Sequence, residues 1–400
     1  MPHPLSSFLP ATALALAGCA ADLAAQAQPW VRHTIDRSSR GADGVRMTDV
    51  NADGQLDIAT GWEEGGVIRA YLHPGPKQVQ KPWPAVTVGR VKSPEDAVFV
   101  DLDGDSAFDV VSSCEGKERR MFIHWAPSEP DRYLDATAWK TEAIPATEGK
   151  TCWMYALPLQ VDGHHGLDLI VGSKNPAGRV AWLQAPEHPR KLDEWQLHEI
   201  CPAGWIMSLR AIDMDKDGDL DILASDRKGK HRGLVWLEHP EQVTDEWPRH
   251  VLGATDREVM FLDMADMNGD GLDDIVSATR NTTITILLRP ANLDESWPRR
   301  EIPTPFGIPL GKAVRIGDID LDGKLDLVIT SNTSDSPGVI WCSIAQDAES
   351  ISGACDISGP QGVKFDRIEL YDIDQDGDLD VITCEERQNL GVIWYENPAR

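Results

Sequence analysis

Residues 213–221 read DMDKDGDLD, a nine-residue window in which aspartates alternate with other residues up to a glycine. Related acidic windows begin at residues 49, 101, 160, 266, 318 and 372. Successive starting points lie 52, 59, 53, 53, 52 and 54 residues apart along the 400-residue chain. Self-similarity at one period of this length indicates a repeat architecture, in which every copy is the same structural unit. The sequence therefore predicts seven copies of one unit.

Each repeat has room for four short strands. An alternating segment such as residues 314–316 precedes the window, and a β-branched run such as residues 326–330 follows it. A third apolar segment comes next, as in residues 234–237, and a fourth begins with tryptophan, as in residues 195–200. Four strands per repeat are typical of a propeller blade. The predicted fold is an all-β, seven-bladed β-propeller with four-stranded blades.

The two ends of the repeat array have matching phases. Residues 30–35 form a fourth-strand segment, whereas the seventh repeat supplies only three strands before Pro398. An N-terminal strand can complete the C-terminal blade, which removes an unpaired sheet edge and ties down both termini. We expect residues 28–400 to form a single propeller closed in this way, and we expect it to be a monomer.

Residues 1–27 have the composition of an export signal. The apolar run at residues 11–17 is too short to span a bilayer. Two cleavage routes stay open, because LAGC at residues 16–19 resembles a bacterial lipobox that would lipidate Cys19, and AQA at residues 25–27 is an ordinary small-x-small site. The prediction is an exported protein, either periplasmic, a cell-surface lipoprotein or secreted, that meets a membrane only through a lipid on Cys19.

The charge of the chain argues against one class of partner. The formal net charge is −27, and a nucleic-acid surface needs a basic stripe that this composition does not offer. The seven windows hold 27 of the 65 acidic residues, so the rest of the chain is nearly neutral. No nucleic acid is expected as a partner, whereas an acidic glycan stays open.

The windows follow the pattern D-x-D-x-D-G-x-x-D. Carboxylates at positions 1, 3, 5 and 9 converge on one point, the glycine permits a sharp turn, and hard oxygen ligands in a flexible loop suit Ca²⁺. An EF-hand would carry a glutamate at position 12 and flanking helices, whereas strands flank each copy here. The predicted ligands are Asp49, Asn51, Asp53 and Asp57; Asp101, Asp103, Asp105 and Asp109; Asp213, Asp215, Asp217 and Asp221; Asp266, Asn268, Asp270 and Asp274; Asp318, Asp320, Asp322 and Asp326; and Asp372, Asp374, Asp376 and Asp380.

About six structural calcium sites are therefore expected. The second window has Ser106 in place of the glycine. The third window departs furthest, since Gln160 and His164 replace carboxylates, and we expect that loop to be empty or weakly occupied.

These windows resemble the FG-GAP/VCBS repeats of integrin-α-type β-propellers, and the resemblance covers roughly residues 30–400. The resemblance implies that each window joins the first two strands of a blade and holds calcium.

The sixth residue after the last aspartate of each window should lie on the opposite rim, because a strand of about five residues spans roughly 17 Å. These rim residues are Glu63, Glu115, Lys174, Arg227, Arg280, Asn332 and Glu386. Acids occupy blades 7, 1 and 2, and cations occupy blades 3, 4 and 5. Neighbouring positions add the cations Lys312 and Lys364, the acids Asp43, Glu95 and Asp366, and the groups Trp153, Tyr155, Trp205 and His231 for stacking or proton transfer.

A mouth of mixed charge suits a carbohydrate that carries a carboxylate or sulfate. The layout resembles that of propellers among the polysaccharide lyases, in which cations such as Arg227, Arg280 and Lys174 would neutralise a uronate and His231 or Tyr155 would transfer a proton during β-elimination. Two other classes stay open: a non-catalytic adhesion or protein-interaction propeller, and a sugar dehydratase-like enzyme.

Cysteine and aromatic positions complete the predictions. Cys342 with Cys355, and Cys114 with Cys152, are candidate disulfides in an exported protein. Recurring tryptophans in the third strands and recurring histidines in the fourth strands are interpreted as packing residues. They are Trp182, Trp236, Trp341 and Trp394, and His33, His198 and His250.

Overall fold

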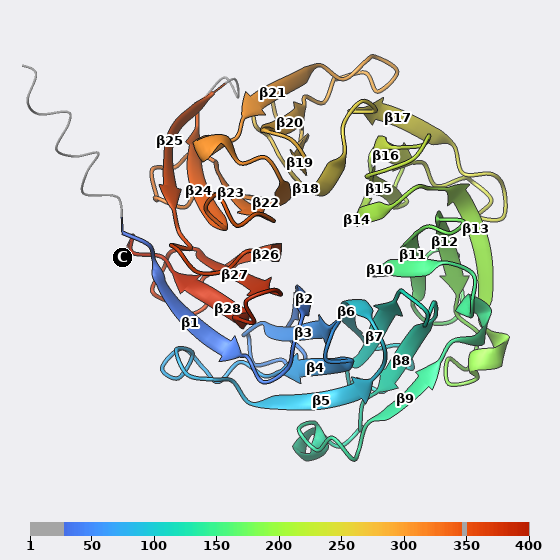
Figure 1. The fold of residues 1–400 in the computed structure, drawn as a ribbon. Coiled ribbons are helices and arrows are strands. Elements are labelled where there is room, and N and C mark those ends of the chain that lie inside the picture. The colour runs from blue at the N-terminus through green and yellow to red at the C-terminus, as the bar shows by residue number, and fades with distance from the viewer. Residues whose placement is uncertain (1–27, 346–349, 400) are drawn as a thin grey trace, which may run out of the picture.

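A computed structural model describes residues 28–345 and 350–399. Seven four-stranded antiparallel sheets surround a central axis, with the first strand of each blade innermost (Figure 1). The predicted seven-bladed propeller is confirmed. The predicted export segment, residues 1–27, lies outside the described residues. Among those residues, no helix has the length and apolar character needed to cross a bilayer.

Each blade takes its strands in chain order. Blade 1 holds β2 (Ala42–Thr48), β3 (Asp57–Trp62), β4 (Val67–Tyr71) and β5 (Ala85–Arg90); blade 2 holds β6 (Pro94–Val100), β7 (Asp109–Cys114), β8 (Met121–Trp125) and β9 (Lys140–Ala143); blade 3 holds β10 (Cys152–Leu159), β11 (Asp168–Lys174), β12 (Arg179–Gln184) and β13 (Gln196–Pro202). Blade 4 holds β14 (Ile206–Ile212), β15 (Asp221–Asp226), β16 (Gly233–Leu237) and β17 (Arg249–Gly253); blade 5 holds β18 (Val259–Ala265), β19 (Asp274–Thr279), β20 (Thr283–Leu287) and β21 (Arg299–Pro303). Blade 6 holds β22 (Gly311–Gly317), β23 (Asp326–Ser331), β24 (Val339–Ile344) and β25 (Ile351–Asp356), and blade 7 holds β26 (Phe365–Tyr371), β27 (Asp380–Glu385), β28 (Gly391–Glu396) and β1 (Val31–Asp36). Short 3₁₀ turns η1 (Pro130–Arg132), η2 (Pro145–Thr147), η3 (Leu192–Glu194) and η4 (Pro305–Gly307) lie in the connections.

The N-terminal strand closes the ring. Strand β1 pairs antiparallel with β28, with Val31 opposite Glu396 and Thr34 opposite Ile393. Figure 1 shows the blue β1 alongside the red β28. Blade 7 is therefore built from both ends of the described chain, as the phases of the repeats predicted.

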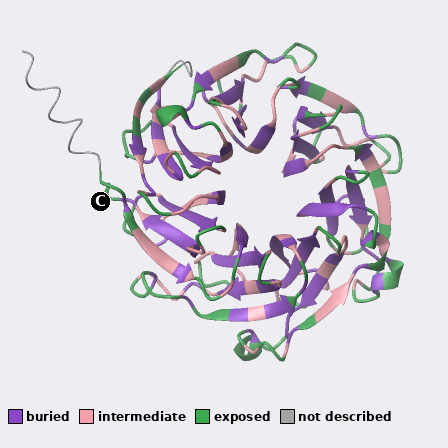
Figure 2. Ribbon diagram, in the orientation of Figure 1, coloured by how far each residue is buried: buried purple, intermediate pink, exposed green. Residues whose placement is uncertain are grey.

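The core lies between neighbouring blades. The second strand of each blade is buried along almost its whole length, because blades pack against both of its faces (Figure 2). Such a strand needs small or β-branched residues on both sides, as in DLVITS of β23. Trp125 of blade 2 and Trp153 of blade 3 share one buried cluster. Outer strands such as β17 face water on one side and are only partly buried.

The recurring aromatic residues pack within the blades. His33 stacks on Trp394 at 4.4 Å between ring centroids, and His250 stacks on Trp236 at 4.2 Å. In blade 3 the same pair is His198 on Trp182. These contacts confirm a packing role.

Free thiols include those of Cys114, Cys152 and Cys342, and each candidate disulfide needs at least one of them, so both candidates are wrong. Cys355 lies opposite Trp341, whereas Cys342 lies opposite Ala354. Because side chains alternate between the faces of a sheet, this one-residue offset directs the two thiols to opposite faces. Cys114 is buried in the core between blades 1 and 2, apart from the start of β10 that carries Cys152.

Candidate functional site

The acidic windows form the turns between the first and second strands of the blades. In the first window, the backbone N–H of Gly54 donates to Asp49 Oδ2 at 2.9 Å, and Gly54 has a φ of +84°. A side chain at that φ is strained, which explains the glycine of the pattern. Ser106 adopts a φ of +73° at the same place in the second window, and its N–H donates to Asp101 Oδ2 at 3.0 Å. The turn is thus kept where the glycine is lost.

The last aspartate of each window is buried and tied to the backbone. In blade 4, Asp221 accepts an N–H from Met214 at 2.9 Å and another from His239 at 2.7 Å. Burial is the main cause that raises the pKa of Asp221 to about 6. Asp168 of the third window makes the same two kinds of bond, to Val161 and Ala185. This aspartate anchors the turn to the end of the third strand, which explains its presence even in the third window.

The other carboxylates of the windows gather as a hard cation requires. In blade 4, one oxygen each of Asp213, Asp215 and Asp217 lies within 4.8 Å of the others. Buried Oδ1 atoms of Asp213, Asp318 and Asp372 have no hydrogen-bond donor within the described part of the chain. Each of these three atoms belongs to the first residue of a window that has aspartate at positions 1, 3, 5 and 9. Buried oxygens without donors, beside two or more further carboxylates, fit Ca²⁺.

The third window has Gln160 instead of a carboxylate at its first position, and the amide of this residue holds the turn together. The Gln160 amide Nε2 donates to the carbonyl oxygen of His164 at 3.0 Å and also to that of Gly166. An N–H donor therefore points to where the other windows direct oxygen. In the second window the Arg190 guanidinium contacts Asp103 and lies 3.9 Å from Asp105, so a side-chain cation already neutralises part of that cluster.

The opposite face carries a pocket of about 330 Å³ on the axis, here called the mouth pocket. Six of the seven predicted rim residues line it: Glu63, Glu115, Lys174, Arg227, Arg280 and Asn332. The seventh, Glu386, borders it through contact with the lining residue Lys364. Asp43, Glu95, Tyr155, Trp205, Lys312, Lys364 and Asp366 also line the pocket, as the sequence predicted.

Two predicted residues lie elsewhere. Trp153 is fully buried in the core, where its indole Nε1 donates to the Thr147 carbonyl at 3.1 Å. His231 lies in the β15–β16 loop and is not among the described residues that line the mouth pocket. Of the two candidate proton-transfer groups, only Tyr155 lines the pocket.

Backbone pairing brings the rim residues to one level. The N–H of Glu63 donates to the Gly41 carbonyl at 2.7 Å, and the N–H of Arg280 donates to the Glu258 carbonyl at 3.0 Å. The antiparallel ladder between the first and second strands thus extends one residue past β3 and β19. A constant distance from window to rim follows, which is why counting residues located the mouth.

The half of the mouth pocket formed by blades 7, 1 and 2 is here called the acidic half. Its carboxylates are Asp43, Glu63, Glu95, Glu115, Asp366 and Glu386. Three lysines pair with it: Lys174 contacts Glu115, Lys364 contacts Glu386, and Lys312 Nζ lies 2.8 Å from Asp366 Oδ2. Since Lys174 of blade 3 and Lys312 of blade 6 pair with acids of neighbouring blades, and Lys364 lies within blade 7 itself, the two signs are less strictly separated than blade order predicted.

Burial strongly affects the carboxylates of the acidic half. Burial is the main cause that raises the pKa of Glu95 to about 8; the charge of Lys174 opposes this rise, and the charges of Glu115 and Glu63 add to it. Burial and the neighbouring charges of Asp366 and Glu95 raise the pKa of Asp43 well above its usual range. The acidic half thus holds more carboxyl groups than its three lysines pair with, and burial favours the protonated form of Asp43 and Glu95.

The basic half is formed by blades 4 and 5 around Trp205. The Arg227 guanidinium lies 4.2 Å from the Trp205 ring centroid, and its Nε lies 2.9 Å from Glu258 Oε2. Arg280 Nε lies 3.8 Å from the same oxygen. Burial, together with repulsion from Arg280, lowers the pKa of Arg227 despite its bond to Glu258. Two guanidinium groups therefore share one carboxylate.

Asp96 and Arg367 line the mouth pocket together with Tyr155. Arg367 Nη1 donates to the Tyr155 hydroxyl at 2.9 Å, and the Arg46 guanidinium lies 4.6 Å from the Tyr155 ring centroid. Burial opposes ionisation of Tyr155, but the charges of Arg367 and Arg46 outweigh it and lower its pKa. The phenol of Tyr155 therefore loses its proton more readily than that of an isolated tyrosine, and its phenolate can act as a base.

A further chain of ion pairs, here called the axial network, links the innermost strands of blades 4 to 7 and contacts Tyr155 through Arg367. Glu369 accepts from Arg315 at 3.0 Å and from Arg367 at 2.8 Å, and Arg210 lies 2.6 Å from Asp263. The sequence predictions did not include this network. A signal for it exists, because Arg46, Arg210, Asp263, Arg315 and Glu369 each lie three residues before a window, where alternation alone predicts apolar residues.

Comparison with known proteins agrees with the repeat interpretation. A model of the FG-GAP-like repeat matches residues 49–112 and residues 266–329, and each match begins at the first aspartate of a window. A search of curated proteins finds no match. The chain therefore contains FG-GAP-like repeats and folds as a seven-bladed β-propeller.

Proposed function

We propose that the mouth pocket binds an acidic saccharide, with its carboxylate or sulfate on the basic half. The observation that carries this proposal is the sharing of one carboxylate, Glu258, by Arg227 and Arg280. An anionic group beside these two guanidinium groups gains charge-assisted hydrogen bonds and removes their mutual repulsion. The basic half is therefore incomplete without an anion.

Trp205 supports a sugar rather than a small inorganic anion. Its ring lies beside Arg227 and is also 4.3 Å from Lys174 Nζ. The Lys174 and Arg227 cations lie over this ring, so they are placed to hold the anionic substituents of a sugar that packs beside Trp205. The 330 Å³ volume suits the end of a short saccharide, since pockets for small ligands range from about 300 to 1,000 Å³.

The same pocket supports β-elimination from a uronate. Tyr155, as the phenolate, removes the C5 proton, and the electron pair forms the C4–C5 double bond as the C4–O bond breaks. The leaving oxygen takes the proton back from the Tyr155 phenol. Arg227 and Arg280 neutralise the uronate carboxylate and so stabilise the negative charge that develops beside it. The side chain of Tyr155 and the basic half together supply both parts of this reaction.

Double substitution Arg227→Ala/Arg280→Ala is expected to weaken the binding of uronate oligosaccharides by at least about tenfold per arginine, because a hydrogen bond to a charged group contributes about 1.5–3 kcal/mol. Isothermal titration calorimetry with oligogalacturonate, oligoalginate and a sulfated glycan measures this. Arg132→Ala, at the exposed η1 turn, removes one guanidinium group outside the mouth pocket and is the control for each single substitution, Arg227→Ala and Arg280→Ala.

Tyr155→Phe is expected to retain binding and to abolish the ultraviolet absorbance of newly formed unsaturated uronate. Binding without such absorbance in the wild-type protein would identify a non-catalytic glycan module. Affinities that are the same in Arg227→Ala/Arg280→Ala as in the wild type would refute the saccharide proposal itself.

We further infer that the six acidic windows other than the third hold Ca²⁺ in a structural role. Buried oxygens without donors and clustered carboxylates support this, and FG-GAP repeats are typical of extracellular proteins, where calcium is abundant. Residues at positions 1, 3 and 5 would hold the ion, with the last aspartate beside them. The ion would supply the positive charge that cancels repulsion within each turn.

A further inference from the structure

We propose that the β15–β16 loop, residues 227–232, extends the mouth pocket into a second subsite for the anionic groups of a longer acidic polysaccharide. The loop, here called the basic loop, reads RKGKHR and contains no acid. Short segments rich in lysine and arginine are typical of surfaces that bind heparin-like glycans or nucleic acids. The inference rests on the proposed function and deepens it, because it makes the ligand a chain rather than a single sugar.

The charges of the basic loop lead outward from the mouth pocket. Arg227 lines the pocket and is only 8% exposed, Lys228 is half-buried, and Lys230 and Arg232 are exposed. One carboxylate or sulfate cannot contact cations at all these depths, whereas successive anionic groups of one chain can. The arrangement therefore favours a ligand with repeated charges that begins in the pocket and leaves it over blade 4.

Trp205 joins the mouth pocket to the basic loop. Lys228 Nζ lies 5.0 Å from the centroid of its ring, which Arg227 and Lys174 also approach. A Cβ on Gly204 would lie 1.6 Å from the Lys228 carbonyl oxygen, so this glycine lets the segment that carries Trp205 pack against the loop. Three cations meet at one ring, and their mutual repulsion is relieved by an anion.

The lysines of the basic loop are not neutralised by the protein. Within residues 28–345 and 350–399, neither Lys228 nor Lys230 forms an ion pair. The corresponding loop of blade 2 shows the other arrangement, since residues 115–120 read EGKERR and Arg120 Nε lies 3.5 Å from Glu118 Oε1. A polyanion would supply the opposite charges that the basic loop lacks.

The backbone of the basic loop is tied to the neighbouring strand and loop. Arg249 Nη2 donates to the His231 carbonyl at 2.7 Å. Arg232 Nε donates to the Thr255 carbonyl at 2.6 Å. A loop that is held in this way loses little backbone freedom when a ligand binds, which favours affinity.

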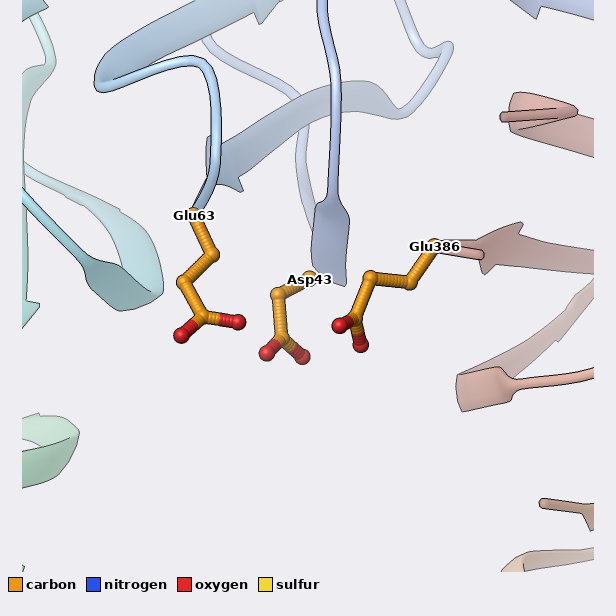
Figure 3. A group of neighbouring side chains, drawn as sticks. All are labelled: Asp43, Glu63 and Glu386. Carbon is orange, nitrogen blue, oxygen red and sulfur yellow. The ribbon is translucent and has the colours of Figure 1, made fainter. Parts of the chain in front are cut away.

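The acidic half disfavours a densely charged chain such as nucleic acid. Figure 3 shows the carboxylates of Asp43, Glu63 and Glu386 side by side on that half. Ionised carboxylates repel a phosphate backbone, which carries one charge per nucleotide. A glycan has uncharged hydroxyls between its anionic groups, so it suits a mouth in which basic and acidic surfaces adjoin.

Chain length tests the second subsite. Disaccharides reach the mouth pocket alone, whereas hexasaccharides of galacturonate, alginate or a sulfated glycan also reach the basic loop and should bind more tightly in calorimetry. Lys228→Gln/Lys230→Gln is expected to reduce this gain in affinity about tenfold, since each exposed charge pair contributes up to about a fivefold change in affinity. Lys77→Gln/Lys81→Gln is the matched control, because it removes the same charge from the exposed β4–β5 connection and should retain the full gain.

The outcomes separate this inference from the proposed function. An equal gain in the wild type and in Lys228→Gln/Lys230→Gln would overturn the second subsite and leave the proposed function standing. Absence of binding of every hexasaccharide to the wild type would refute the proposed function and the subsite with it. Tighter binding of a single-stranded oligonucleotide than of the hexasaccharides would overturn the assignment of the ligand as a glycan.

Lysine acylation followed by peptide mass spectrometry tests the wild-type protein without a variant. A bound hexasaccharide should protect Lys230 from acylation, and a bound disaccharide should not. Lys77 should react equally in all samples and serves as the internal control. Acylation of Lys230 that a bound hexasaccharide leaves unchanged would contradict the second subsite.

Discussion

Glu369→Ala is expected to lower the free energy of unfolding by about 3 kcal/mol, because removing one partner of a buried ion pair leaves the other charge uncompensated. Glu369 accepts from Arg315 at 3.0 Å and from Arg367 at 2.8 Å in the axial network. Its side chain is 21% exposed, so the lower end of the usual 3–5 kcal/mol range applies. Urea-induced unfolding followed by tryptophan fluorescence measures the change.

A matched control separates burial from charge. Glu194→Ala removes an exposed carboxylate that pairs with Lys191 at 3.1 Å, and its cost should stay within about 1 kcal/mol. Equal losses in the two variants would show that the axial network contributes no more than a surface pair.

The contribution of Glu369 should also depend on pH. Burial alone would raise its pKa, but Arg315 and Arg367 outweigh burial and lower the pKa to about 2 from the ordinary 4.5. A lowered folded-state pKa means that the stabilisation is fully present above the unfolded-state value and is lost as the pH falls toward 2. The difference in stability between the wild type and Glu369→Gln should therefore shrink between pH 4.5 and pH 2. A constant difference across this range would contradict the ion-pair explanation.

Removal of calcium is the second change with a large expected effect. Each site filled at a calcium concentration 100 times its Kd adds about 2.7 kcal/mol of stability. Six such sites together exceed the roughly 5–15 kcal/mol by which folded proteins are usually stable. We therefore expect EDTA to lower the thermal unfolding temperature steeply, or to unfold the protein, and calcium but not magnesium to restore it.

Window variants show which turns are responsible. Asp215→Asn/Asp217→Asn in blade 4 should remove one bound ion and reduce the stabilisation by calcium. Asp162→Asn in the third window should leave the number of bound ions unchanged, because the Gln160 amide already bridges that turn. A protein whose unfolding temperature is the same with and without EDTA would refute the structural role of calcium.

Local patterns predicted most of the fold. A window every 53 residues or so gave the number of blades, and the phase of residues 30–35 gave the closing strand. The first and second strands pair in the same way in the blades, so the number of residues from window to rim is constant. Counting along the sequence therefore placed Glu63 and Arg227 in the mouth pocket. These features depend on neighbours in sequence and on strand periodicity.

Contacts between blades were not predictable in the same way. Arg46 meets Asp96 of the next blade at 3.1 Å, and Arg367 meets Tyr155 from four blades away in chain order. Spacing within one repeat does not tell which charges of different repeats meet across the axis. His231 illustrates the same limit, since a loop position on the mouth face does not determine whether its side chain turns inward.

The pairing of β1 with β28 constrains the order of folding. His33 and Glu396 are 363 residues apart, yet their side chains meet at 2.6 Å. The entropic cost of loop closure grows slowly with length, by about 0.6 kcal/mol for each doubling of the loop, but strand pairing between the two ends waits for synthesis of the last strand. During translation, blades 1 to 6 can assemble as an open arc whose first and last surfaces stay exposed. A circular permutant that joins the present ends and opens the chain between two blades would remove this delay. Its refolding rate, compared with that of the wild-type protein, would measure how far the pairing of β1 with β28 limits folding.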